Sequence, residues 1–103
     1  HIETLADMKP EEALSLGELI RKTSKAIQTI TGAEKAYSIM FSDKPDFSHV
    51  HFHIVPRHKD LPLEQRGSNI FQFLNVTDNL IVPLEQRNQF AAQIRAFLLE
   101  PSF

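Results

Sequence analysis

The chain has 103 residues, of which 42% are hydrophobic and 23% charged, as is typical of one small globular domain. Its 11 basic and 13 acidic residues give a net charge of −2, so it lacks the positive charge expected of a duplex nucleic-acid binder. There is no cysteine, which excludes disulfides, thiolate nucleophiles and cysteine-ligated zinc. No stretch has the apolar length of a membrane span. We therefore expect a single cytoplasmic domain over residues 1–103, with no nucleic-acid or membrane partner.

The spacing of apolar residues predicts a helix over about residues 10–31. Pro10 suits the first helical position, and Glu11 and Glu12 follow where negative charge stabilises a helix N-terminus. Gly32 stands where a left-handed C-cap would end the helix. Largely apolar side chains recur at three- and four-residue spacing and predict one buried stripe: Leu16, Leu19, Ile20, Thr23, Ile27 and Ile30.

Two alternating stretches predict strands at 35–42 and at about 48–56. Turn-forming residues separate them at 43–46, so residues 36–56 are expected to form an antiparallel hairpin with a short loop. Pro56 is expected to end the second strand. We expect a loop over residues 57–69, followed by a short apolar run at 70–74 that periodicity cannot assign to helix or strand. A second helix is expected over residues 83–99, ending before Pro101.

Three of the five histidines of the chain lie in the second predicted strand. Polar and apolar residues alternate strictly from residue 49 to 54, which places His49, His51 and His53 on one face. Neighbouring imidazoles are expected about 6.5–7 Å apart. The three apolar residues between them point the other way, and we expect the 10–31 helix to cover that side of an antiparallel sheet: Val50, Phe52 and Ile54.

Three neighbouring imidazoles suit attack on a phosphoryl centre. Imidazole is neutral and nucleophilic, or cationic and proton-donating, near neutral pH. Like charges this close oppose simultaneous protonation, so one ring can attack while another protonates a leaving group. Such a reaction would pass through a covalent phosphohistidine-type intermediate.

Metal binding is the alternative chemistry for this face. Histidines two apart on a strand can share one zinc, copper or iron ion, with further ligands from elsewhere in the chain. The candidates for these further metal ligands are His1, Asp43, Asp46, His58 and Asp60.

The third interpretation is a solvated strand face without chemistry.

The segment from His49 to Arg57 resembles the signature of the histidine-triad (HIT) superfamily, His-φ-His-φ-His-φ-φ, where φ is apolar. Apolar residues fill every φ position, and Pro56 with Arg57 matches the continuation seen in the nucleotide-hydrolase branch. The resemblance is clear over residues 1–57. It implies an α+β fold with helices packed on an antiparallel sheet, a homodimer, and N-terminal strands that would precede His1.

The resemblance also implies an activity. Such proteins are nucleotide hydrolases or nucleotidyl transferases that attack the α-phosphate of a nucleoside phosphate ester, anhydride or phosphoramidate, without an obligatory metal or other cofactor. His51 would be the nucleophile that becomes nucleotidylated, His53 would contact the bridging oxygen, and His49 would orient His51. The candidate substrate-binding residues are Ser42, Ser48 and Arg57.

The chain departs from the family pattern just before the triad. Family hydrolases commonly have a Gly-Gln-Ser/Thr run there, whereas this chain has residues 44–48, with the negative charge of Asp46 where phosphate contacts are expected. Ser48, or a basic residue such as Arg57 or Lys59, is the candidate to replace those contacts. A non-catalytic nucleotide-binding protein is therefore the alternative function, followed by a metal site on the histidine face.

Overall fold

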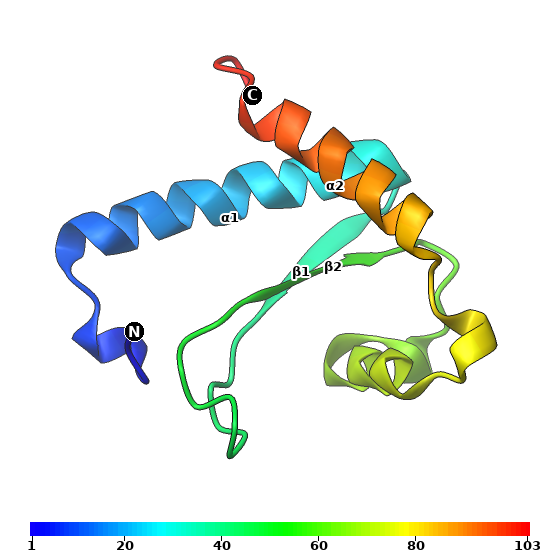
Figure 1. Ribbon diagram of the computed structural model, residues 1–103, viewed down its shortest axis with the longest axis horizontal. Coiled ribbons are helices and arrows are strands. Elements are labelled where there is room, and N and C mark those ends of the chain that lie inside the picture. Colours follow the sequence, from blue (N-terminus) through cyan, green and yellow to red (C-terminus); the bar gives the residue numbers. More distant parts are fainter.

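The computed structural model describes residues 1–103, with the side chains of all but Asn75 and Asp78. Helices and one antiparallel sheet are both present, so the α+β class is confirmed (Figure 1). Within the described part of the chain, no helix has the length and apolar character needed to cross a bilayer. The elements in chain order are η1 (Leu5–Asp7), α1 (Pro10–Thr31), β1 (Lys35–Ile39), β2 (His53–Arg57), η2 (Leu63–Gln65), η3 (Gly67–Asn75), η4 (Asp78–Leu80) and α2 (Leu84–Leu98).

Helix α1 has the predicted bounds, and its ends show why. The Glu12 carboxylate accepts a hydrogen bond from the backbone N–H of Lys9 at 3.1 Å, which satisfies a donor that the helix itself leaves free. At the other end Gly32 adopts φ 72°, and its N–H donates to the Gln28 carbonyl at 2.9 Å. A left-handed residue of this kind is nearly always glycine, so the predicted C-cap is confirmed.

The sheet has two antiparallel strands, with a register that runs from Lys35 opposite Arg57 to Ile39 opposite His53. The prediction that the second strand starts near residue 48 is wrong. It starts at His53, because β1 ends opposite that residue and offers no further ladder partner. The preceding segment runs past the N-terminus instead, where the Val50 N–H donates to the Ile2 carbonyl at 2.7 Å.

Two further details of the predicted hairpin are also wrong. The strand does not end at Pro56, which pairs with Ala36 inside the ladder. Both strands of a two-stranded sheet are edge strands, and these tolerate proline. The connection is not short either, since it spans residues 40–52. Ser42 has φ 48°, a left-handed conformation that turns the backbone out of the extended path soon after β1 ends.

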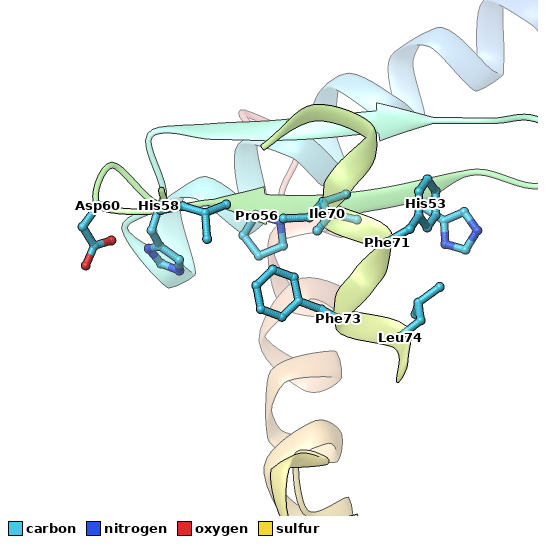
Figure 2. Close-up of a pocket in the computed structure, with 10 residues that line it drawn as sticks. His53, Pro56, His58, Asp60, Ile70, Phe71, Phe73 and Leu74 are labelled. Atoms are coloured by element: carbon cyan, nitrogen blue, oxygen red, sulfur yellow. The ribbon is translucent and has the colours of Figure 1, made fainter. Parts of the chain in front are cut away.

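Helix α1 and the 3-10 helix η3 flank the sheet. Helix α1 contacts both strands, and its Leu16 and Leu19 share a cavity with Val50 and Phe52, which is the side predicted for the helix. The apolar run at 70–74, which the sequence left unassigned, belongs to η3, and η3 lies against β2 (Figure 2).

Helix α2 confirms the predicted second helix to within a residue at each end. It lies beside α1 (Figure 1), and the chain after it folds back onto α1. There the Phe103 ring lies 4.6 Å from that of Phe97, and the Lys25 ammonium lies 4.8 Å from the Phe103 ring centroid. These contacts attach the C-terminal segment to α1.

The molecule is less compact than a self-sufficient domain of its size. Its accessible surface is 7785 Å², whereas a compact monomer of this mass exposes about 5,900 Å². Its radius of gyration is 15.1 Å, against about 13 Å for a typical domain of about 100 residues. Only a small set of described hydrophobic side chains is buried: Ala26, Ile27, Ala33 and Ile70.

Candidate active site

The imidazoles of His49, His51 and His53 form a row. The ring centroids of His49 and His51 are 5.2 Å apart, and those of His51 and His53 are 5.3 Å apart. This is closer than the predicted spacing of about 6.5–7 Å. The reason is that only His53 lies in the ladder, so the other two rings are not held at the repeat of a regular strand.

A backbone hydrogen bond orients the middle ring. Nδ1 of the half-buried His51 lies 2.8 Å from the carbonyl oxygen of His49. A carbonyl oxygen only accepts, so Nδ1 must carry the proton. In the neutral ring Nε2 then keeps its lone pair and is the nucleophilic nitrogen.

The three imidazoles line a cavity of about 550 Å³. This is within the usual range for small-molecule sites. Aromatic rings of Phe41, Phe47 and Phe71 form much of its apolar wall, and Ser42, Asp43 and Lys44 supply further polar atoms. The cavity therefore combines an aromatic wall, one ammonium group, one carboxylate and a row of imidazoles.

Two phenylalanines hold the histidine row in place. The Phe71 ring meets His53 edge-on, with centroids 5.4 Å apart and planes at 89°. The Phe47 ring meets His51 at 6.5 Å and 64°. Edge-to-face pairs of this kind restrict ring rotation and add about 0.5–1.5 kcal/mol each.

The predicted substrate contacts do not all reach this cavity. Ser42 lines it, and its hydroxyl donates to the Glu3 carbonyl at 3.1 Å. Ser48 is not among the lining residues, and its hydroxyl donates to the Glu3 carboxylate at 3.2 Å. Glu3 therefore ties both serines to the N-terminal segment.

Arg57 lies at the far end of β2 from His53 and is not among the lining residues either. Only 6% of it is exposed, and its guanidinium lies 3.3 Å from the Glu34 carboxylate. Its Nε is buried with no hydrogen-bond partner among the described residues. The structure thus places Arg57 in an ion pair between strand and helix end.

Several cavity residues were not anticipated from the sequence. Phe41 and Phe71 lie far from the histidines in the chain, and no pattern links them to the triad, whereas Phe47 lies two residues before His49 and continues its alternation. His1, considered only as a metal ligand, has its ring 5.4 Å from that of His49. Lys44 belongs to the turn predicted at 43–46. Contacts between distant segments bring His1 and Phe71 to the histidines, so local periodicity gives no signal for them.

No group of three or more histidine, aspartate or glutamate side chains among those described is arranged to hold a metal ion. Comparison of the chain with models of known families, with curated proteins and with solved structures found no match. The function is therefore argued from the geometry of the histidine row, and the family resemblance stays a prediction.

Proposed function

We propose that this protein is a nucleotide hydrolase or nucleotidyl transferase in which His51 attacks the α-phosphate of a nucleoside phosphate ester, anhydride or phosphoramidate. The hydrogen bond from His51 Nδ1 to the His49 carbonyl carries this proposal, because in the neutral ring it leaves the lone pair on Nε2. The histidine-triad pattern of residues 49–57 points to the same chemistry.

The cavity wall supports a nucleotide as the ligand. A nucleobase has a flat π-face that stacks on aromatic side chains, and three phenylalanines line this cavity. The Lys44 ammonium offers charge for a phosphate oxygen. The hydroxyl of Ser42 lies in the same wall, although it already donates to Glu3.

The reaction can be written with its atoms balanced. The Nε2 lone pair of His51 forms a bond to phosphorus while the bond from phosphorus to the leaving group breaks, and protonated His53 gives its proton to the departing atom. Water then attacks phosphorus, neutral His53 takes its proton, and the N–P bond breaks to restore His51. In a transferase, another hydroxyl or amine would replace water.

A non-catalytic nucleotide-binding protein is the second candidate. Asp43 lines the cavity, so a carboxylate lies on the same wall as Lys44 and would oppose charge that develops on the phosphate. This repulsion would slow attack more than it would weaken binding of the nucleobase. Calorimetry with a non-hydrolysable nucleotide, combined with a turnover assay, separates the two candidates.

We also propose that the chain self-associates as a homodimer. Its accessible surface exceeds that of a compact monomer by about 1,900 Å². A standard stable interface buries about 800 Å² per partner. Both edges of the two-stranded sheet also offer unpaired backbone groups to another chain.

Turnover of a nucleoside 5′-phosphate aryl ester tests the proposal. The wild-type chain is expected to release the phenol, and His51→Asn is expected not to. Because asparagine can still donate to the His49 carbonyl, this variant removes the nucleophile with the least disturbance of the backbone. Equal turnover by both proteins would rule out His51 as the nucleophile.

A further inference from the structure

A second cavity of about 520 Å³ lies between β2 and η3 (Figure 2). His53, Phe71 and Leu74 line both this cavity and the one that contains His51. The two cavities therefore meet at His53. This histidine is also the proposed proton donor, so one cavity lies on each side of the donor.

The second cavity has an apolar body and one polar end. Figure 2 shows Pro56, Ile70 and Phe73 along its middle, with His58 and Asp60 at the end far from His53. Its described lining residues include no lysine or arginine, and the Asp60 carboxylate is its one anionic group. The cavity is therefore suited to an apolar group with a positive charge at its tip.

We infer that this cavity is the leaving-group subsite and that it accepts an aromatic or other apolar group with a cationic end. The inference rests on the proposed function. When phosphorus is bonded to His51, the departing atom must lie next to the proton donor His53. Whatever is attached to that atom then extends past His53, into the second cavity.

The charge of the cavity separates substrate classes. A leaving group that carries phosphates, such as a second nucleotide, would bring negative charge next to Asp60, with no lysine or arginine among the described lining residues to offset it. The strand from His53 to Arg57 is about 13 Å long, at about 3.3 Å per residue. This length leaves room for one aromatic ring with an amino arm.

Three aryl esters of one nucleoside monophosphate test the inference. Their leaving groups are 4-(aminomethyl)phenol, 4-(hydroxymethyl)phenol and 4-hydroxyphenylacetate, which share a ring and differ in charge. The cationic ester is expected to have a kcat/KM about tenfold above the anionic one, as a single charge contact in partly screened surroundings allows. Equal values for the three esters would overturn the subsite.

Two variants, each with a matched control, show which residues of the cavity cause the preference. Asp60→Asn is expected to abolish the preference for the cationic ester, whereas Asp7→Asn, in which the exposed carboxylate belongs to neither cavity, is expected to keep it. Phe73 is 45% exposed, so Phe73→Ala should fold, and it is expected to lower kcat/KM for all three esters. The matched control is Leu63→Ala, at a side chain that is 78% exposed and outside both cavities.

A substrate with a small leaving group separates this inference from the proposed function. The leaving group of a nucleoside 5′-phosphorimidazolide is too small to fill the second cavity, so its hydrolysis reports on His51 and His53 without the subsite. Hydrolysis of the imidazolide without selectivity among the esters would overturn the subsite and leave the proposed function standing. Without any turnover, NMR titration with free 4-(aminomethyl)phenol decides: binding that Asp60→Asn weakens supports the subsite, and no binding overturns it.

Discussion

Nδ1 of His51 donates to the carbonyl oxygen of His49 across 2.8 Å, and this contact fixes which nitrogen of the ring can react. The contact joins two members of the histidine row through the backbone of one and the side chain of the other. Both groups belong to the same short segment of the chain, so the chain itself orients the nucleophile. Orientation of this kind lowers the entropy cost of attack.

Two replacements of His51 should distinguish the roles of its two ring nitrogens. In His51→Asn the side-chain amide can still donate to the His49 carbonyl, whereas in His51→Gln the amide lies near the position of Nε2. Neither side chain is a nucleophile, so both variants are expected to lose about a thousandfold or more in kcat. Thermal unfolding should show a smaller loss of stability for the asparagine variant. Retained activity in either variant would assign the attack to another residue.

Removing the proton donor should make the rate depend on the leaving group. His53→Ala is expected to lower kcat/KM, which reports on release of the leaving group, about a hundredfold for an unsubstituted phenyl ester, because the departing oxygen then leaves without a proton. For a 4-nitrophenyl ester, whose leaving group is stable as an anion, the loss should be small. Steady-state assays of both esters check this. A loss of equal size for the two esters would argue that His53 only shapes the cavity.

The two glycines of the α1 region should respond in opposite directions to alanine. A Cβ at Gly32 would meet no atom within 4 Å, but its φ of 72° is strained for any L side chain, so Gly32→Ala should destabilise by about 1 kcal/mol. Gly17 lies inside the helix, also with open space for a Cβ, and Gly17→Ala should stabilise by about 0.5–1 kcal/mol. Urea unfolding curves measure both, and effects of the same sign would contradict the C-cap assignment.

The ion pair of Arg57 should matter for stability rather than for substrate binding. Glu34→Gln removes the charge opposite the buried guanidinium, and because Glu34 is 47% exposed the cost should be only about 1 kcal/mol. The control is Glu85→Gln, at an exposed position in the first turn of α2. KM should stay unchanged in both variants. A raised KM for Glu34→Gln would indicate that Arg57 contributes to substrate binding after all.

Self-association should depend on concentration. The accessible surface of the chain exceeds that of a compact monomer by about 1,900 Å², and exposed large side chains such as Leu14, Phe41 and Leu74 contribute to it. We expect both the sedimentation coefficient and the unfolding temperature to rise with protein concentration. Analytical ultracentrifugation over about a hundredfold range of concentration measures the sedimentation coefficient. A monomer throughout would contradict the proposed homodimer.

Local sequence patterns predicted the helices well. Proline and glutamates at its start and Gly32 at its end define α1, and these signals act within one helical turn. The alternation of residues 49–54 correctly placed Val50 and Phe52 on a side that shares a cavity with α1, although His51 lines that cavity too. Neighbouring side chains of an extended backbone point in opposite directions whether or not the segment is hydrogen-bonded to another strand. The alternation therefore remains informative although residues 49–52 lie outside β2.

The remaining features depend on contacts between distant segments. Where β2 begins is decided by the end of β1, and the alternation of the histidine segment carries no information about its partner. Phe71 reaches His53 from η3, eighteen residues away in sequence. Arg57 lies four residues after His53, yet its burial beside Glu34 takes it away from the cavity. The residue types alone indicated phosphoryl chemistry at the histidines, whereas tertiary packing decides which residues line the cavity with them.

The most direct measurement is the mass of the protein during turnover. Mixing with an aryl ester of a nucleoside monophosphate, rapid quenching at alkaline pH where an N–P bond survives, and peptide mapping should find one added nucleoside monophosphate on His51. The adduct should form and decay at rates that account for kcat, and His51→Asn should not form it. Turnover without an adduct, or an adduct on another residue, would contradict nucleophilic attack by His51.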